Sequence, residues 1–452
     1  MTQYSDVSLA VASGTGPRAS APPTTSITAV AAASFIGTAI EWYDFFLYGT
    51  AAALVFNKLF FPTFDPAVGT LAALGTYAVG FAARPVGGVV FGHFGDRIGR
   101  KAVLFVTLLM MGVATFAIGL LPTYATIGFA APLLLTTMRL VQGFGLGGEW
   151  GGAVLMAVEH APANRRGFYA ALPQVGAAAG LLVANGVFAL TQRLSGDDFL
   201  RWGWRIPFLL SVVLVAVGTF IRIRLAESPH FAQLKAEKAE ARMPIAEVLR
   251  AHKKGVVLAM GARMAECVFF YIYTITILGY ATQRAGLPKG TAMTGVLIAA
   301  AIDLVAIPFF GALSDRLGRR PVYLFGAAFS ALFVVPFFLL VDTGRPALVW
   351  LAIVLGVCVG HAAMYGPQAA FFSELFGTKV RYTGASLGYQ LSSVLGGGLA
   401  PIIAASLFLA AHGAWWGVAA YMIGCAALTL VAVYLAAETG ARALGDSPGT
   451  EA

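Results

Sequence analysis

"GHFGDRIGRK" occupies residues 92–101, and "GALSDRLGRR" occupies residues 311–320, an offset of 219 positions. A second repeat has an offset of 215, where Glu159 and Arg166 match Glu374 and Arg381. Each pair falls at the same place in its half of the chain, so the sequence predicts two copies of one structural unit. The residues repeated within the two loops are Gly92 and Gly311, Asp96 and Asp315, Arg97 and Arg316, Gly99 and Gly318, and Arg100 and Arg319.

The composition around these loops is that of a membrane protein. The chain has 452 residues, of which 58% are hydrophobic and only 11% are charged, and its mean hydropathy is +0.79. Soluble domains contain about 25% charged residues. Apolar runs long enough to cross a bilayer recur along the whole chain. We therefore predict an all-α integral membrane fold with twelve transmembrane helices in two pseudo-symmetric six-helix bundles.

The predicted organisation places six spans on each side of a polar segment. A disordered tail covers 1–28, the N-terminal half covers 29–224, a linker covers 225–254, the C-terminal half covers 255–437, and a second tail covers 438–452. The spans are placed at 29–53, 68–91, 101–121, 127–157, 166–190, 205–224, 255–281, 291–312, 321–341, 346–372, 382–408 and 414–437.

The distribution of basic residues predicts the orientation. If both tails are cytoplasmic, 20 of the 30 Lys and Arg residues lie in cytoplasmic segments, 7 lie in external loops and 3 lie inside spans. Cytoplasmic loops of membrane proteins carry this excess of positive charge. The formal charge of +9 is thus explained by topology, and we expect no nucleic-acid partner.

The loop pattern G-x-x-x-D-R-x-G-R-[RK], present twice, resembles the signature of the major facilitator superfamily. Further stretches resemble its metabolite:proton symporter family: "EWYDFFLYG" (41–49), "RPVGGVVFGHFGDRIGRK" (84–101), "RLVQGFGLGGEWGGA" (139–153), "RWGWRIPF" (201–208) and "AESPHF" (226–231). The resemblance implies a multi-pass transporter of the bacterial inner membrane that works by alternating access. Members of this family carry citrate, 2-oxoglutarate, shikimate and other organic acids, or betaine and proline.

The repeated loops are predicted to form a cytoplasmic gate. An aspartate there can approach the positive end of a neighbouring helix and pair with the arginines beside it. The resemblance implies that this network latches the outward-facing state, whereas the alternative is that the arginines only anchor the topology. The predicted gate residues are Gly92, Asp96, Arg97, Arg100, Glu159, Asp315, Arg316, Arg319 and Glu374.

Glu41 and Asp44 lie one helical turn apart inside the first span. An ionised side chain at the bilayer centre costs about 2.5–3.5 kcal/mol or more, and burial favours the protonated form of a carboxyl group. One or both could carry the transported proton, pair with buried arginines, or bind a substrate cation. We favour proton coupling, and Asp44 slightly over Glu41.

Arg139, in the fourth span, is the third predicted coupling residue. A buried guanidinium stays charged and needs a carboxylate partner. The resemblance links an arginine of the R-x-x-Q-G-x-G-x-G pattern to proton coupling with the acid of the first span. We expect Arg139 to pair alternately with Glu41 or Asp44 and with substrate, or else to hold spans 1 and 4 together in a static ion pair.

The seventh span is the internal counterpart of the first, so it should also line the cavity. Arg263 is predicted to bind a substrate carboxylate, with Glu266 and Tyr273 nearby, while Asp303 of the eighth span binds substrate or pairs with Arg263. His361 is interpreted as a hydrogen-bonded interior residue. The expected substrate is a small carboxylate imported with protons; a zwitterion such as betaine or proline, or export by antiport, is the alternative.

Several other motifs are given structural interpretations. "GFGLGG" at 143–148 matches a dinucleotide-binding pattern but lies inside a predicted membrane helix, where glycines allow close packing. We find no nucleotide-binding loop, zinc motif or serine triad in the sequence, so we predict no enzyme, no catalytic or metal site and no cofactor, with a proton gradient as the energy source. A monomer in the lipid bilayer is expected.

Overall fold

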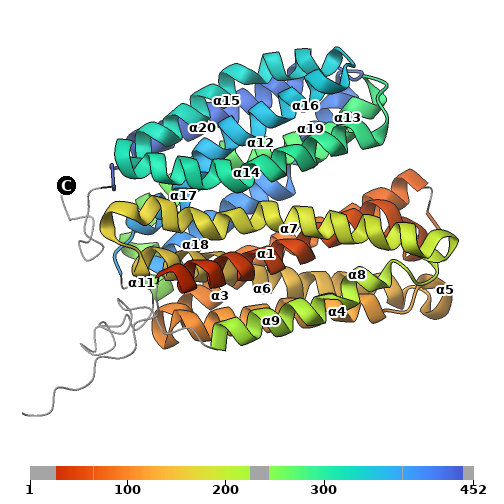
Figure 1. The fold of residues 1–452 in the computed structure, drawn as a ribbon, viewed down its shortest axis with the longest axis horizontal. Coiled ribbons are helices and arrows are strands. Elements are labelled where there is room, and N and C mark those ends of the chain that lie inside the picture. The colour runs from red at the N-terminus through yellow and green to blue at the C-terminus, as the bar shows by residue number, and fades with distance from the viewer. Residues whose placement is uncertain (1–26, 65, 224–243, 379, 441–452) are drawn as a thin grey trace, which may run out of the picture.

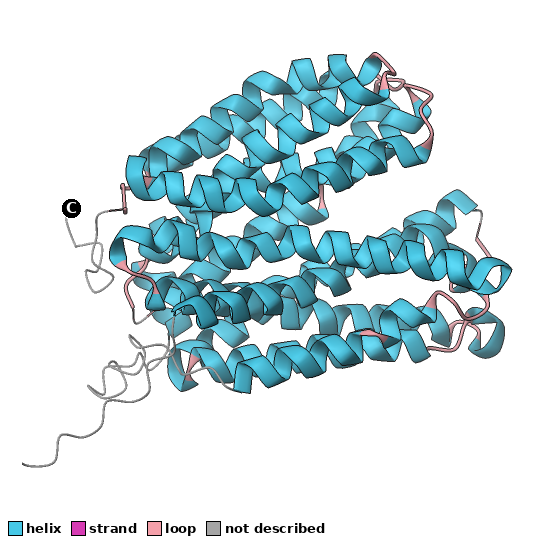
Figure 2. Ribbon diagram, in the orientation of Figure 1, coloured by secondary structure: helices cyan, strands magenta, loops and turns pink. Residues whose placement is uncertain are grey.

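The computed structural model describes residues 27–64, 66–223, 244–378 and 380–440. These residues form helices joined by short loops and contain no strand (Figure 2). Figure 1 shows two lobes, one built from the N-terminal helices in red to yellow-green and one from the C-terminal helices in green to blue. The prediction of twelve membrane helices in two six-helix bundles is confirmed.

The first lobe contains six membrane-crossing elements. They are α1 (Ile27–Ala51) continued by η1 (Ala52–Phe56) and α2 (Asn57–Leu59), α3 (Pro66–Ile98), α4 (Arg100–Leu120), α6 (Ala130–His160), α7 (Arg166–Ser195), and α8 (Arg205–Leu209) with α9 (Ser211–Ile223). Short helices α5 (Tyr124–Ile127), η2 (Ala163–Arg165) and η3 (Gly196–Leu200) lie in the connections.

The second lobe repeats this arrangement. Its elements are α12 (Lys253–Tyr271), η4 (Ile272–Thr276) and α13 (Ile277–Gln283); α14 (Lys289–Leu317); α15 (Arg319–Asp342); α16 (Pro346–Leu355), η5 (Gly356–His361) and α17 (Ala362–Glu374); α18 (Arg381–Ser392), η6 (Ser393–Gly398) and α19 (Ala400–Ala410); and α20 (Trp416–Leu435). The predicted linker contributes α11 (Pro244–Ala251), whereas 224–243, most of the predicted N-terminal tail and 441–452 lie outside the described residues.

Eight of these elements are apolar and long enough to cross a membrane by composition alone. Helices α1, α3 and α6 are not among these eight, and they carry Glu41 and Asp44, Arg84, and Arg139, respectively. The α8–α9 region is apolar but shorter.

Four of the crossing elements contain a π-helical stretch, a feature that often marks functional sites. Those in α1 and α12 cover 52–56 and 272–276, nearly equivalent positions of the two lobes. The stretch in the tenth span includes His361, and the stretch in the eleventh contains the glycines 396–398.

The lobes meet along α7 with α14 and α17, and along α3 with α18. We call the end of the molecule that carries the loops 92–101 and 311–320 the motif end; it lies on the left of Figure 1. Gly99 and Gly318 separate consecutive helices there with φ values of 116° and 96°, a backbone conformation that favours glycine. This explains why both repeated loops carry glycine at that position.

Candidate functional site

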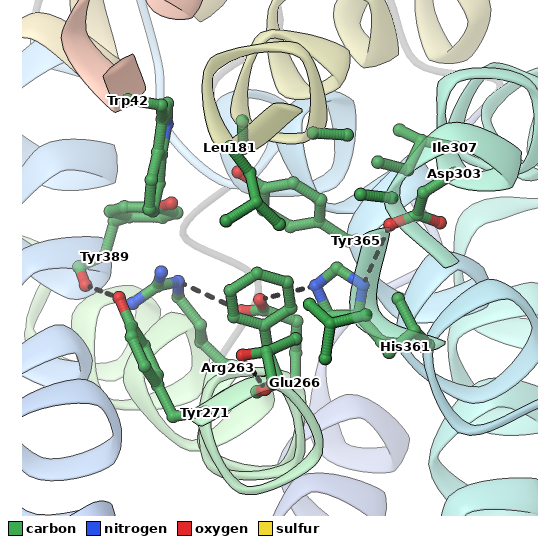
Figure 3. Close-up of a pocket in the computed structure, with 17 residues that line it drawn as sticks. Trp42, Leu181, Arg263, Glu266, Tyr271, Asp303, Ile307, His361, Tyr365 and Tyr389 are labelled. Atoms are coloured by element: carbon green, nitrogen blue, oxygen red, sulfur yellow. Dashed lines mark hydrogen bonds and ion pairs between the residues drawn. The ribbon is translucent and has the colours of Figure 1, made fainter. Parts of the chain in front are cut away.

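A pocket lies between the two lobes (Figure 3) and has a volume of about 510 Å³, including its part open to solvent. The first lobe contributes side chains of α1 and α7, and the second lobe contributes the charged ones. The lining residues are Trp42, Ala177, Ala178, Leu181, Arg263, Glu266, Phe270, Tyr271, Thr274, Val296, Ala300, Asp303, Ile307, Val357, His361, Tyr365 and Tyr389.

Four buried charged or titratable side chains form a chain along the wall of this pocket. Arg263 Nε lies 3.2 Å from Glu266 Oε2, and Glu266 Oε1 lies 3.2 Å from His361 Nε2. His361 Nδ1 lies 3.7 Å from Asp303 Oδ2, which is an ion-pair distance but too long for a hydrogen bond. Asp303 therefore contacts His361, and the expected Asp303–Arg263 pair is replaced by the Arg263–Glu266 pair.

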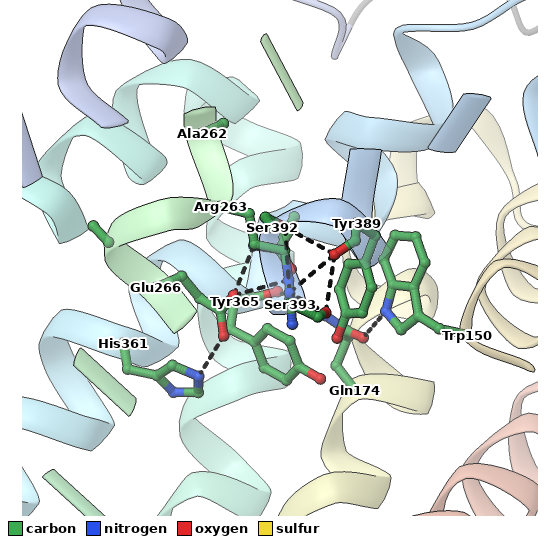
Figure 4. A network of polar contacts seen from close by, with 12 residues as sticks. Trp150, Gln174, Ala262, Arg263, Glu266, His361, Tyr365, Tyr389, Ser392 and Ser393 are labelled. Carbon is green, nitrogen blue, oxygen red and sulfur yellow. Dashed lines mark hydrogen bonds and ion pairs between the residues drawn. The ribbon is translucent and has the colours of Figure 1, made fainter. Parts of the chain in front are cut away.

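The guanidinium of Arg263 is fixed from the eleventh span. Its Nη1 donates to the carbonyl of Tyr389 at 3.1 Å, to Ser392 Oγ at 3.3 Å and to Ser393 Oγ at 2.6 Å. The same guanidinium lies 3.5 Å from the centre of the Tyr389 ring, within the range of a cation–π interaction. Arg263 is thereby oriented toward the pocket by three hydrogen bonds from one nitrogen (Figure 4).

The Tyr389 ring also carries the contact across the lobes. It stacks on Trp150 of α6 with a centroid distance of 3.7 Å and an interplanar angle of 13°. Trp150 Nε1 donates to Gln174 Oε1 at 2.7 Å, and Gln174 Nε2 donates to the Tyr365 carbonyl at 3.4 Å. This set, shown in Figure 4, joins helices of both lobes directly beside Arg263.

The first lobe holds a second buried polar site. Asp44 is 1% exposed, and neither of its carboxylate oxygens has a hydrogen-bond partner among the described residues. Arg139 donates from Nη1 to Gln142 Oε1 at 3.2 Å, Gln142 donates from Nε2 to Thr115 Oγ1 at 2.7 Å, and Thr115 lies beside Asp44. Asp44 and Arg139, the predicted coupling pair, are therefore close together, and the side chains of Gln142 and Thr115 connect them. Glu41 is also buried.

Aromatic rings surround the arginines of the first lobe. Arg139 lies 4.9 Å from the ring centre of Phe45, 4.5 Å from that of Tyr48 and 4.7 Å from that of Tyr77. Arg84 is 3% exposed and lies 4.5 Å from the ring centre of Phe45. Cation–π contacts of this kind stabilise guanidinium groups that are removed from water.

At the motif end, each repeated aspartate binds the start of a helix in the other lobe. Asp96 Oδ2 accepts hydrogen bonds from the backbone nitrogen of Thr383 at 3.0 Å and from its hydroxyl at 2.8 Å. Asp315 accepts from the backbone nitrogens of Gly167 at 2.7 Å and Phe168 at 2.9 Å. Anions are stabilised at helix N-termini, so both contacts hold the lobes together.

Three ion pairs complete this layer. Arg381 Nη1 lies 3.1 Å from Glu159 Oε1 and joins the lobes. Arg319 lies 2.7 Å from Asp315 and 3.1 Å from Glu374 within the second lobe. The predicted gate residues Asp96, Glu159, Asp315, Arg319 and Glu374 are thus brought together.

The remaining predicted gate residues have other surroundings. Arg97 is exposed and lies 3.4 Å from His93, and Arg316 is also exposed. A Cβ at Gly92 would lie 3.0 Å from the Cα of Thr383, so this glycine permits close contact between the lobes. The side chain of Arg100 lies outside the described part of the structure.

Two of the predicted substrate residues lie away from the pocket. Tyr273 is fully buried in the second lobe with its ring centre 4.3 Å from that of Phe337, and it is not among the residues that line the pocket. Arg139 is likewise absent from that lining. Tyr271, two positions before Tyr273, points to the pocket instead because the helix turns by about 100° per residue.

Sequence reasoning missed several partners that come from distant segments. Gln368 donates from Nε2 to Glu266 at 3.3 Å, and Glu438 accepts from the backbone nitrogens of Arg319 at 2.8 Å and Arg320 at 2.9 Å. One signal was present in the sequence. Asp44 and Arg263 are 219 positions apart, as are Arg84 and Asp303, so the offset of the repeated loops also relates the buried charges.

Comparisons with known proteins agree with this architecture. A family model described as "Sugar (and other) transporter" matches residues 29–254, and one described as "Major Facilitator Superfamily" matches residues 303–448. The shikimate transporter of Escherichia coli (strain K12) is 44% identical over 89% of this chain and 93% of its own length.

Two further comparisons have a lower sequence identity. The proline/betaine transporter of the same organism is 34% identical over 84% of this chain and 77% of its own length. A solved structure of the proton:xylose symporter XylE covers 93% of this chain and 98% of its own, with a TM-score of 0.73 at 16% identity. The protein therefore belongs to the major facilitator superfamily and is a membrane transporter, not an enzyme.

Proposed function

We propose that this protein imports a small carboxylate together with protons, by alternating access across the bacterial inner membrane with both termini in the cytoplasm. The observation that carries the proposal is the position of Arg263, a buried guanidinium in the wall of a pocket between the lobes. Its Nη2 makes no hydrogen bond to the described residues. A guanidinium oriented in this way is suited to a carboxylate.

The relatives support an organic acid as substrate. The protein that is 44% identical is named a shikimate transporter, whereas the proline/betaine transporter is 34% identical. Shikimate combines one carboxylate with hydroxyl groups, which the polar side chains around Arg263 can bind. A shikimate-like acid or a di- or tricarboxylic acid is therefore the first choice.

The buried acids support proton coupling. Asp44 lies in a helix of the first lobe without a hydrogen bond from the described residues, close to Arg139 and Thr115. A carboxylate in this setting is costly unless it binds a proton or a cation. Protonation of Asp44 would remove that cost, so Asp44 is the proposed coupling residue of this lobe, with Glu41 as the alternative.

One observation favours a different substrate. Arg263 is already neutralised by Glu266 at 3.2 Å, and the pocket contains the aromatic side chains of Trp42, Phe270 and Tyr271. Aromatic rings bind quaternary ammonium groups through cation–π interactions. A betaine- or proline-type zwitterion is therefore the second candidate, and export by antiport is the third.

The test measures charge movement in proteoliposomes of the purified protein. Shikimate, citrate, 2-oxoglutarate, succinate, aromatic acids, betaine and proline are added in turn across a range of external pH. We expect a current evoked by a carboxylate that grows with acidity and is lost in Asp44→Asn. Asp198→Asn is the matched control, because Asp198 is half-exposed and its ion pair among the described residues is with Arg201 at 3.0 Å.

The outcomes separate the candidates. A response only to betaine or proline would replace the carboxylate with a zwitterion and would make Arg263 a partner of internal acids. An unchanged current in Asp44→Asn would move the proton site away from this residue. Outward movement of the substrate driven by an inward proton gradient would replace import with antiport.

A further inference from the structure

The charged groups of the pocket wall do not balance. Among the described residues that line the pocket, Arg263 contributes one positive charge, and Glu266 and Asp303 contribute two negative charges. All three side chains are at most 4% exposed. A net charge in a low dielectric is unfavourable. One additional proton makes the cluster neutral, and His361, at 3% side-chain exposure, is the group placed to hold it.

The position of His361 fits the protonated ring. Its two nitrogens face two different carboxylates, Glu266 at 3.2 Å and Asp303 at 3.7 Å (Figure 3). A neutral imidazole has one N–H and can donate to only one of them, whereas the imidazolium donates to both. His361 Nδ1 and Asp303 Oδ1 have no hydrogen-bond partner among the described residues. If the distance between His361 Nδ1 and Asp303 Oδ2 shortened by about 0.7 Å, these two atoms would form the second hydrogen bond.

The groups around His361 come from every packed element and contain no second cation besides Arg263. They are Arg263 and Glu266 from α12, Asp303 from α14, Tyr365 from α17, Cys358 from its own stretch, and Tyr323 of α15, which reaches Glu266 through Gln368. The ring of Tyr365 stacks on His361 at a centroid distance of 4.9 Å. The positive charge of a protonated His361 is thus balanced by the carboxylates of Glu266 and Asp303.

Glu266 is shared between the two basic groups. Its Oε2 lies 3.2 Å from Arg263 Nε, and its Oε1 lies 3.2 Å from His361 Nε2. While His361 is neutral, Arg263 is the only cation near Glu266, and a substrate carboxylate would have to compete with it. Once His361 is protonated, Glu266 has a second cation at the same distance, and Arg263 can accept the substrate.

We propose that His361 holds the proton that is taken up with the substrate in the second lobe, and that Glu266 shifts from Arg263 to the protonated His361, which frees Arg263 to bind the substrate carboxylate. This inference rests on the proposed carboxylate import and adds the residue that links the two ligands. The empty cluster carries a charge of −1. One proton and one monocarboxylate leave the charge of this cluster at −1, so the net charge that the current measures comes from a further proton, for which Asp44 is the proposed site.

The experiment counts protons taken up when substrate binds. Purified protein in detergent is titrated with shikimate by calorimetry in phosphate and in Tris, whose ionisation enthalpies differ, so that the difference in heat gives the number of protons. We expect about one proton per shikimate for the wild type and none for His361→Gln. The affinity of the wild type for shikimate should weaken about tenfold for each pH unit above the pH at which His361 loses its proton. His361→Gln should lose this dependence on pH.

A control variant and a second variant of the network complete the experiment. His160→Gln is the control, because the ring of His160 contacts the carbonyl of Met156 at the end of α6, outside the pocket. Glu266→Gln should bind shikimate at least as tightly as the wild type at high pH and without proton uptake, because Arg263 no longer has a competing carboxylate. A merely structural Glu266 would instead give weaker binding.

Three results would overturn the inference. The first is undiminished proton uptake in His361→Gln. The second is loss of uptake in Asp44→Asn while His361→Gln keeps it, which would place the proton in the first lobe. The third is loss of shikimate binding in both His361→Gln and Glu266→Gln, which would make the network structural. If wild-type protein binds none of the acids of the transport panel, the proposed function fails instead.

Discussion

At equivalent positions of the two lobes, the buried charges have opposite signs. Asp44 corresponds to Arg263, and Arg84 corresponds to Asp303. Each lobe therefore carries an acid and a base at the same two places, with their order reversed. Only the second lobe turns these charges to the described pocket. The first lobe encloses its own charges among aromatic rings, so the symmetry of the fold supports two sites with different chemistry.

The enclosure of Arg139 depends on one glycine. A Cβ at Gly80 would lie 2.7 Å from Arg139 Nε and 3.2 Å from its Cδ. Gly80→Ala should therefore displace the guanidinium and reduce uptake severalfold, although alanine favours a helix by about 1 kcal/mol over glycine. Uptake into proteoliposomes and thermal unfolding measure the two effects.

Gly75→Ala is the matched control for Gly80→Ala. Gly75 lies in the same helix, and a Cβ there would meet no atom within 4 Å. This variant should keep its uptake and gain stability. Equal uptake in the two variants would show that the position of Arg139 is unimportant for transport.

At the scale of helices, the aspartates of the repeated loops accept hydrogen bonds from helices of the opposite lobe. Asp96 is bound by the start of α18, and Asp315 by the start of α7. A charge-assisted hydrogen bond is worth about 1.5–3 kcal/mol. Asp96→Asn keeps the side-chain shape but removes the charge, so it should shift the equilibrium between lobe arrangements by about tenfold or more toward opening at the motif end.

Spin labels can measure this opening. Ile98 and Leu317 are exposed, lie at the motif end and belong to different lobes. Labels at Ile98→Cys and Leu317→Cys should report a longer distance in Asp96→Asn, while the native Cys267, Cys358 and Cys425 are buried and free. Asp198→Asn should leave the distance unchanged. The same distance distribution with and without Asp96→Asn would contradict a latch at this helix end.

The start of α15 is bound by Glu438, which follows the last membrane helix. Burial acts to raise the pKa of Glu438, but hydrogen bonds from the backbone nitrogens of Gly440, Arg319, Arg320 and Thr439 outweigh it and hold the pKa below its usual value. A lowered pKa in the folded state means that the stabilisation is present above the unfolded pKa of about 4.3 and is lost as the pH falls through the folded value.

Glu438→Gln should accordingly destabilise the protein at pH 7 by about 1 kcal/mol, as for the loss of a helix cap. The difference from wild type should shrink as the pH falls below about 4. Thermal unfolding in detergent at pH 7 and pH 3 tests this, with Asp198→Asn as control. A difference that is the same at both values would mean that the charge of Glu438 does not stabilise α15.

At the scale of the whole molecule, sequence predicted the architecture better than the site. The twelve spans follow from apolar length, and the two lobes follow from the repeated loops, because both are local patterns. Arg263 and Glu266 were placed together because they are one helical turn apart. The partner His361 lies 95 positions from Glu266, and only packing of α12 against η5 brings them together. The sequence therefore predicted a hydrogen-bonded interior histidine but not its partners.

The closed motif end and the pocket between the lobes define one state of a transporter that should rock between two. A Cβ at Gly92 would lie 3.5 Å from the Cβ of Thr383 in the other lobe, within the range of about 3.5–4.5 Å that a disulfide needs. The double variant Gly92→Cys with Thr383→Cys should therefore cross-link on oxidation and hold the motif end closed. Uptake should fall to background when the cross-link is complete and return on reduction.

The reduced double variant is its own control, because it carries the same substitutions without the bond. Substrate binding is the second readout that separates arrest from damage. The cross-linked protein should still bind shikimate added from the open side of the pocket, since the lining residues are not altered, while transport stops. Full uptake by completely cross-linked protein would contradict the opening of the motif end as a step of transport, and with it the alternating movement of the two lobes about the Arg263 pocket.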